Sequence, residues 1–200
     1  YILSLFFFMA VNSLEFRRQA FHAMLGIVIV LLVLVGVLTA KRLLLVVIIG
    51  AVISGISVKY RIPLISWFLD NFDRKNEKIP GKGAIFYILG CLIVLALFPQ
   101  RIALASILVM ALGDSFATVV GFHFGKIKSI TRKTLEGFFA GAFAGFIGAV
   151  LFVDYFSALA GSLAAMFFDM LEIRLGSKVI DDNIMVPLTA ALVMWIIALL

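Results

Sequence analysis

The chain has 200 residues, of which 64% are hydrophobic, and its mean hydropathy is +1.20. A soluble globular domain carries about 45–50% apolar residues, so the composition excludes that class and indicates a polytopic membrane protein. The single cysteine, Cys91, excludes an intrachain disulfide and a cysteine metal cluster, and the net charge of +6 must be located before it can be interpreted.

The chain begins with an apolar run at residues 2–11, about half the ~20 residues that a span needs. We expect a short interfacial helix or the tail of a longer span there, and no cleavable signal peptide, because no basic n-region is present. Seven longer apolar segments follow, each predicted as a spanning helix, at residues 20–39, 43–58, 84–98, 102–123, 136–153, 155–172 and 184–200. The sequence thus predicts an all-α, polytopic transmembrane helix bundle in one integral-membrane domain (residues 1–200), with about seven spans plus a short N-terminal helix.

Lys and Arg are distributed unequally between the two sides of this predicted bundle. One side has three of them, Lys41, Arg42 and Arg101. The other fourteen are Arg17, Arg18, Lys59, Arg61, Arg74, Lys75, Lys78, Lys82, Lys126, Lys128, Arg132, Lys133, Arg174 and Lys178. The positive-inside rule therefore places the basic side in the cytoplasm. Because these cations line a membrane surface and no recognition module is present, nucleic-acid binding is not expected.

The longest connection, residues 59–83, is apolar in its first half and polar in its second half. The first half predicts an amphipathic helix in the membrane interface, anchored by Trp67, and Pro80-Gly81 predicts a turn before the next span. The connection is either a solvated cytoplasmic loop near anionic lipid or a lid over a nucleotide, with Lys82 as its best-placed cation.

The entry to the first full span carries a polar pattern. Glu15, Arg18, His22 and Gly26 are spaced by three, four and four residues, so they share one face of a helix, whereas Arg17 points elsewhere. In one interpretation, the two Arg residues mark a membrane boundary, and one of them pairs with Glu15 one helical turn away. In the other, these residues belong to a functional site in which His22 is a hydrogen-bond donor or a base.

An acidic residue, Asp114, interrupts the apolar run of the fourth predicted span. A carboxylate in such a segment costs about 2.5–3.5 kcal/mol on insertion scales, so it is a functional-site hypothesis by default. Gly121 and Gly125 continue its helix face, and a basic loop follows at residues 124–135. Phosphoryl transfer needs a carboxylate to bind a divalent metal, glycines that allow close approach, and cations that neutralise phosphate oxygens. Helix packing is an alternative explanation for the glycines.

Further acidic residues lie on the same predicted side of the membrane. Glu136 begins a predicted helix directly after Lys133-Thr134, where the helix dipole also favours an acid. Five carboxylates reach one membrane face: Asp114, Asp169, Glu172, Asp181 and Asp182. Oxygen ligands of this kind suit Mg²⁺, which uses few protein carboxylates, so some must support the metal indirectly or pair with cations. Helix capping is the alternative for residues 181–183.

Several motifs resemble a known family. Residues 112–117 (LGDSFA), 121–126 (GFHFGK) and 132–137 (RKTLEG) resemble the core of the CTP-dependent lipid kinases, which include dolichol kinase, phytol kinase and CTP-dependent diacylglycerol kinase. Residues 15–26 are similar to that group's Glu-x-Arg-Lys-x3-His element, with Arg18 in place of the usual Lys, and residues 181–188 (DDNIMVPL) to its last motif. The resemblance covers most of the chain from Glu15 onwards.

This resemblance implies a kinase that uses CTP and Mg²⁺ to phosphorylate the hydroxyl of a membrane lipid alcohol at the cytoplasmic face. A dolichol- or polyprenol-type acceptor is expected, with diacylglycerol as an alternative. Asp114, with Asp181 or Asp182, would hold the metal, and the expected catalytic residues are Asp114, His22, Arg17 and Arg18. The residues expected to bind nucleotide or phosphate are Gly121, Gly125, Lys126, Lys133, Thr134, Glu136 and Lys82. Four further residues are expected to support the site: Glu15, Asp169, Glu172 and Asn183. Either His22 or a carboxylate would be the base.

Two other functions remain to be distinguished. The related phosphatidate cytidylyltransferases, which make CDP-lipids, share the Gly-Asp and Lys-Thr-x-Glu-Gly parts, but their Pro-Gly-His-Gly-Gly run is absent from residues 169–188. A transporter also accommodates a buried Asp and glycine-rich helices, but its charges should be spread along a pathway rather than gathered on one face. The pattern favours the kinase, with the oligomeric state left open.

Overall fold

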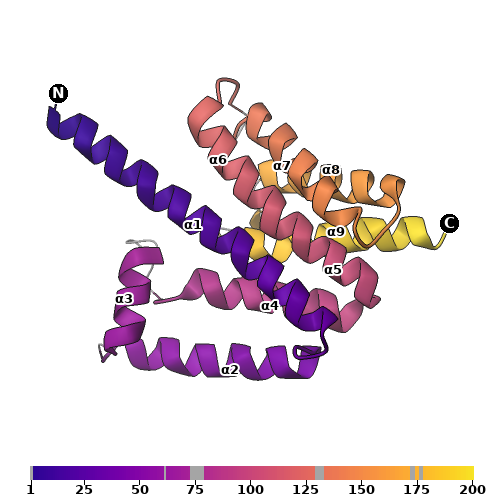
Figure 1. Cartoon of the computed structure of the whole chain (residues 1–200), viewed down its shortest axis with the longest axis horizontal. Helices are drawn as coiled ribbons and strands as arrows, with labels where there is room; N and C mark the ends of the chain where they lie inside the picture. Colours follow the sequence, from indigo (N-terminus) through magenta and orange to yellow (C-terminus); the bar gives the residue numbers. More distant parts are fainter. Residues whose placement is uncertain (1, 61, 73–78, 129–132, 172–173, 176–177) are drawn as a thin grey trace.

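The computed structural model describes residues 2–60, 62–72, 79–128, 133–171, 174–175 and 178–200. Their helices form a single bundle, with the long helix α1 running diagonally across it (Figure 1). The α-helices in these ranges are α1 (Ile2–Leu34), α2 (Ala40–Ser57), α3 (Pro63–Phe72), α4 (Lys82–Leu97), α5 (Gln100–Leu108), α6 (Ser115–Phe124), α7 (Leu135–Ala149), α8 (Tyr155–Leu171) and α9 (Asp182–Ala198). A π-helical turn, η1 (Val109–Asp114), joins α5 to α6, and an antiparallel pair of short strands, β1 (Arg174–Leu175) and β2 (Lys178–Val179), precedes α9.

The predicted helical fold is confirmed, because a helix occupies each of the seven apolar segments. Among the described residues, three segments are long and apolar enough to cross a membrane: Leu14–Leu34, Ala40–Ser57 and Gln100–Phe124. The helices α4, α7, α8 and α9 are apolar but have only 15 to 17 residues, fewer than the ~20 of a typical span. The number of seven spans is therefore not confirmed.

The expected separate N-terminal helix is wrong, because residues 2–11 are the first part of the continuous helix α1. Neither glycine nor proline occurs between Ile2 and Leu25, so no residue in this stretch favours a break in the helix. The polar residues in the middle of α1 are therefore part of the helix and do not end it.

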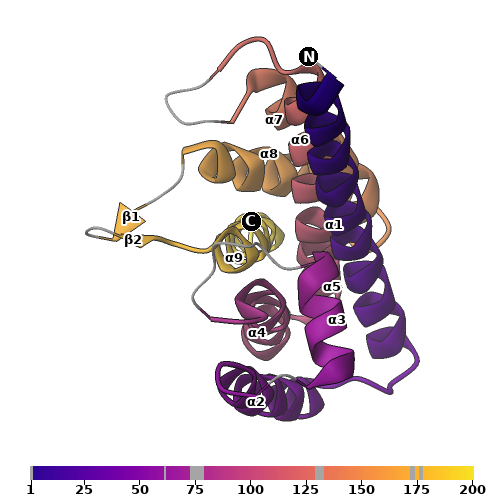
Figure 2. The same ribbon diagram turned by 90° about the vertical axis from the view of Figure 1, so that its left-hand side faces the viewer.

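The two ends of the bundle differ in their connections. Short turns join α1 to α2, α4 to α5 and α7 to α8. Helix α3, the α6–α7 connection and the strand pair lie at the other end, which faces the viewer in Figure 2. The predicted helix within residues 59–83 is present as α3, and the predicted turn at Pro80-Gly81 leads into α4, with Gly81 at a φ of 71°.

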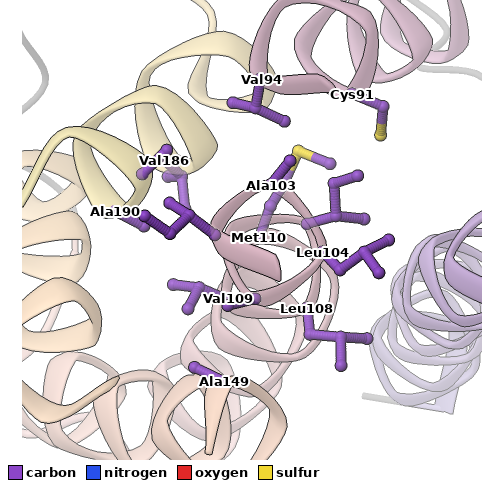
Figure 3. Packing of buried hydrophobic residues seen from close by; sticks show 14 of the residues in the cluster. Cys91, Val94, Ala103, Leu104, Leu108, Val109, Met110, Ala149, Val186 and Ala190 are labelled. Carbon is purple, nitrogen blue, oxygen red and sulfur yellow. The ribbon is translucent and has the colours of Figure 1, made fainter. Parts of the chain in front are cut away.

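Helix α5 lies at the centre of the core. Every residue from Ile102 to Ala111 is buried, as expected of a segment that is apolar on all its faces. Figure 3 shows side chains of this segment surrounded by Cys91 and Val94 of α4 and by Val186 of α9. The buried segment that leads into Asp114 is therefore packed against α1, α4, α7 and α9, which restricts the position of its backbone.

The π-helical turn η1 separates the buried helix α5 from α6 and ends at Asp114. A π turn contains more residues per turn than an α-helix, and such turns are frequent at functional sites. The chain therefore changes its helical register immediately before its most unusual acid.

Helix α1 contacts the centre of the bundle at Gly26. A Cβ atom at this position would lie 2.3 Å from the Ala111 Cβ and 2.3 Å from the Tyr87 hydroxyl, so a larger residue would push α1 outwards. We predict that Gly26→Leu destabilises the protein by about 1–3 kcal/mol, through overpacking. The melting temperature in detergent, measured by scanning fluorimetry, should fall by about 2–4 °C for each kcal/mol.

The control for this change is Gly55→Leu in α2, where nothing lies within 4 Å of an added Cβ. An equal loss of melting temperature in both variants would contradict the close packing of α1 on η1.

Candidate active site

Three carboxylates from distant parts of the chain meet at one end of the bundle. Asp114 ends η1, Asp169 lies in the last turn of α8, and Asp182 is the first residue of α9. One oxygen from each of them lies within 4.8 Å of the others. Asp169 is only 4% exposed, so its charge needs compensation from nearby groups. We refer to Asp114, Asp169 and Asp182 as the carboxylate cluster.

Lys133, in the α6–α7 connection, supplies a positive charge to the carboxylate cluster. Its ammonium group donates hydrogen bonds to Asp169 and, at 3.0 Å, to Asp182. Burial lowers the pKa of Lys133, but the charges of Asp169, Asp182 and Asp114 raise it more, so the pKa lies above its usual value. Lys133 therefore stays protonated, and the cluster keeps an excess of negative charge when its acids are ionised.

His22 of α1 approaches the cluster from another side. Its Nε2 lies 3.5 Å from Oδ2 of Asp114, which is longer than a normal hydrogen bond. Two hydrogen bonds hold α1 against the rest of the bundle beside Asp114. The Tyr87 hydroxyl donates to the His22 carbonyl (3.1 Å), and the Ser115 hydroxyl donates to the Gln19 carbonyl (3.1 Å). The Tyr87 ring also packs edge-on against the imidazole, with 4.4 Å between centroids.

Two buried polar atoms beside Asp114 have no hydrogen-bond partner within the described part of the chain. They are His22 Nε2 and Gln19 Oε1. Leaving a buried polar atom unpaired costs about 1–3 kcal/mol, so such atoms indicate a place for a polar ligand or water. Sequence analysis missed Gln19 and Tyr87, because neither residue type is unusual in a helix of this composition.

A first cavity, of about 340 Å³, opens beside these atoms. Its polar lining includes Arg18, His22, Lys82, Asp114, Asp181 and Asp182. Leu69 and Phe72 of α3 also line it, and Phe72 contacts Phe21 of α1 with 5.0 Å between ring centroids. The cavity is therefore polar near Asp114 and apolar under α3.

A second cavity, also of about 340 Å³, lies between α6, α7 and α8. Thr118, Lys128, Lys133, Thr134 and Asp169 contribute its polar lining. Because the first cavity reaches two members of the carboxylate cluster and the second reaches the third, the cluster borders both cavities.

The predicted phosphate-contacting glycines are closely packed. A Cβ on Gly125 would lie 2.5 Å from the Thr134 Cγ2, and one on Gly121 would lie 3.0 Å from the Thr134 hydroxyl oxygen. This geometry supports the packing alternative, in which small residues allow α6 and α7 to approach. Gly121 and Gly125 also line the second cavity, and their contact with phosphate stays a prediction.

Two other residues with predicted phosphate roles hold the local backbone. The Glu136 carboxylate accepts hydrogen bonds from the N–H groups of Lys126 (3.1 Å) and Ile127 (3.2 Å). The Thr134 hydroxyl accepts from the Gly137 N–H (3.2 Å) and so caps α7. Lys126 is exposed, and among the described residues neither it nor Glu136 lines the two cavities.

Asp181, predicted as a metal ligand, has a different position from Asp182. Within the described residues it is not a member of the carboxylate cluster. Its carboxylate caps α9 by accepting from the Asn183 N–H (3.2 Å) and side-chain amide (2.9 Å), and it lies 3.9 Å from Lys82 Nζ. The third acid of the cluster is Asp169, which sequence analysis treated as a supporting residue.

The predicted residues of α1 differ in their contact with the site. Arg18 pairs with Glu15 (2.8 Å) and lines the first cavity, whereas Arg17 is exposed. Glu172 and Arg132 lie outside the described residues, so their predicted positions stay untested.

Comparisons with known proteins give three informative relatives. An uncharacterized protein of Methanocaldococcus jannaschii is 34% identical over 186 residues, which cover 90% of this chain and 92% of the relative. CTP-dependent diacylglycerol kinase 1 of Schizosaccharomyces pombe is 27% identical over 204 residues, covering 92% of this chain and 93% of that protein. A chloroplastic protein of Triticum aestivum, named a probable phytol kinase, is 31% identical over 132 residues, 58% of this chain and 44% of the relative.

No model of a known protein family and no solved structure matches the chain. The relatives nevertheless agree with the resemblance seen in the motifs, and the chain belongs to the family of CTP-dependent lipid kinases.

Proposed function

We propose that the chain transfers the γ-phosphoryl group of CTP to the hydroxyl of a membrane lipid alcohol, at the cytoplasmic face of the membrane. The observation that carries this proposal is the meeting of Asp114, Asp169 and Asp182 with Lys133 at a point that borders two cavities. The names of the relatives support both the donor and the class of acceptor.

The carboxylate cluster fits a divalent cation by the chemistry of its donors. Its three acids offer oxygen atoms within 4.8 Å of one another, and hard oxygen ligands suit Mg²⁺. Bound there, Mg²⁺ would neutralise charge on the phosphate oxygens of the nucleotide. Asp114, Asp169 and Asp182 would hold the ion, and Lys133 would add a positive charge on the side of the second cavity.

The two cavities suit the two substrates. The second cavity, with Lys128 and Lys133, suits a triphosphate. The first cavity suits the acceptor hydroxyl, because Gln19 Oε1 can accept its hydrogen bond and His22 Nε2 or a carboxylate can take its proton. The oxygen then bonds to the γ-phosphorus as the bond to the β-phosphate oxygen breaks, and CDP leaves.

An activity matrix tests this function. Purified protein is incubated with γ-labelled CTP or ATP, with or without Mg²⁺, and with a polyprenol, phytol or diacylglycerol. We expect label to pass from CTP to lipid, to require the metal, and to favour the polyprenol-type acceptor. A parallel reaction with cytidine-labelled CTP and a phosphatidate tests the alternative: cytidine label in the lipid, with no γ-phosphate label in any lipid, would instead indicate a CDP-lipid synthase.

We also propose that α4, α7, α8 and α9 cross a locally thin membrane as short or tilted spans, which gives seven spans with the site on the cytoplasmic side. Single cysteines introduced at Lys126 and Asp154, which are exposed on either side of the short helix α7, test this, since the native Cys91 is buried. An impermeant maleimide should label Lys126→Cys only from the cytoplasmic side and Asp154→Cys only from the opposite side. Labelling of both from one side would contradict the topology.

A further inference from the structure

A third hollow, the apolar groove between α2, α3 and α4, has no role in the steps above. Its volume is about 270 Å³, and its apolar lining includes Val46, Ile49 and Ile53 of α2, Leu69 of α3, and Ile85 and Ile88 of α4. Within the described part of the chain, no charged side chain lines it. The hydroxyl of Ser54, one of its few polar groups, already donates to the Pro80 carbonyl at 2.6 Å. A groove of this chemistry suits a hydrocarbon rather than a nucleotide or an ion.

The apolar groove adjoins the first cavity. Leu69, Gly81 and Ala84 line both of them, so the two spaces lie next to each other at α3 and at the turn that precedes α4. His22 and Gln19 line the first cavity, and His22 Nε2 and Gln19 Oε1 are two of the buried atoms that have no hydrogen-bond partner among the described residues. A molecule that filled both spaces would have an apolar chain at one end and a hydrogen-bonding group at the other.

The outer side of the groove belongs to a helix that suits a lipid environment. Helix α2 is one of the segments long and apolar enough to span a membrane, and little of it is buried within the chain. Val46 and Ile49 line the groove while remaining 40% and 57% exposed, so an acyl or isoprenoid chain can reach them from the bilayer.

We propose that the apolar groove binds the part of the acceptor lipid's tail nearest its head, with α3 as its cover and the hydroxyl directed towards His22 and Asp114. This inference rests on the proposed function and adds to it the path of the acceptor. It assigns α3 to the lipid, whereas the sequence left residues 59–83 as either a solvated cytoplasmic loop or a lid over a nucleotide.

Two glycines of α2 provide a matched test. Gly50 lines the groove, and its added Cβ would make only an ordinary contact, 3.7 Å from Ile85 Cγ1, so a larger side chain is expected to extend into the groove. Gly55 is exposed on the same helix, with nothing within 4 Å of an added Cβ. Gly50→Phe should raise the KM for a long-chain alcohol about tenfold, as expected from displacing roughly two buried methylene groups. The KM for CTP should stay unchanged, and Gly55→Phe should behave like the wild type.

Equal KM values for the long-chain alcohol in both variants would overturn the proposal. So would an equal rise in KM for a short, water-soluble alcohol, because that molecule has no tail to displace.

A second measurement does not depend on turnover. A polyprenol carrying a diazirine near its hydroxyl is irradiated with the wild-type protein and with Gly50→Phe, and the labelled peptides are identified. We expect labels on α2 and α4, and we expect Gly50→Phe to reduce them. Labels confined to α7 and α8 would contradict the assignment of the groove to the lipid tail. Labelling of the groove without any kinase activity would support the lipid site while contradicting the proposed function.

Discussion

Asp114→Asn should reduce turnover by about a thousandfold or more while leaving the protein folded, because it removes a charge aimed at the reacting groups. Asp114 shares its cluster with Asp169 and Asp182, and oxygens of the three lie within 4.8 Å. Removing one negative charge relieves repulsion among them, so the melting temperature should be unchanged or slightly higher. Label transfer from γ-labelled CTP and scanning fluorimetry in detergent measure the two quantities.

Asp154→Asn is the matched control for this change. Asp154 lies at the opposite end of the bundle, between α7 and α8, where it accepts a hydrogen bond from the Ser157 N–H at 2.9 Å. This variant should keep its turnover and lose only a little stability. Near wild-type turnover in Asp114→Asn would show that the carboxylate cluster is not the catalytic centre.

Lys133→Met should cost roughly 3–5 kcal/mol of stability in addition to activity, because it leaves the carboxylate of Asp169 buried without its cation. Adding Asp169→Asn to this variant should restore much of the stability but none of the turnover, because the buried charge is removed and the site is not rebuilt. Lys41→Met, at an exposed position on the other end of the bundle, should change stability by no more than about 0.5 kcal/mol.

The pH dependence of this effect follows from the raised pKa of Lys133. A raised pKa means that the contribution to stability is fully present below the usual lysine value of 10.5 and is lost only as the pH rises through the still higher folded value. The difference in melting temperature between wild type and Lys133→Met should therefore not decrease from about pH 7 to pH 10, because Lys133 stays charged while the acids that it pairs with stay ionised or become more so. If the difference in melting temperature disappeared within this pH range, the ion pairs of Lys133 would not be the source of the stabilisation.

Much of the helical architecture could be predicted because apolar runs alternate with polar connections. The run before Asp114 is apolar on every face, and it became the central helix α5. Asp114 itself was identifiable because an acid inside such a run is energetically unfavourable. The number of full spans was less predictable, because α4, α7, α8 and α9 have only 15 to 17 residues, fewer than the ~20 of a typical span.

Only some of the partners within the site could be predicted, because the others depend on how helices are arranged side by side. Asp169 stands at the end of an apolar helix, where the sequence suggested only a supporting acid, yet α8 brings it to Asp114 and Lys133. Asp181 and Asp182 are adjacent in the chain, and only the direction in which α9 starts decides that the second joins the cluster. The spacing of residues along one helix carries no information about these choices.

The π-helical turn η1 has a consequence for how the length of this segment can vary. A π turn holds about one residue more than a turn of α-helix, so it can lose one residue by becoming α-helical while the helices on either side keep their orientation. A deletion within α5 has no such reserve, because each residue rotates an α-helix by about 100°. Val109, Met110 and Ala111 are fully enclosed, so a deletion within η1 should preserve the direction of Asp114 better than one within α5, provided that the remaining side chains keep a similar size.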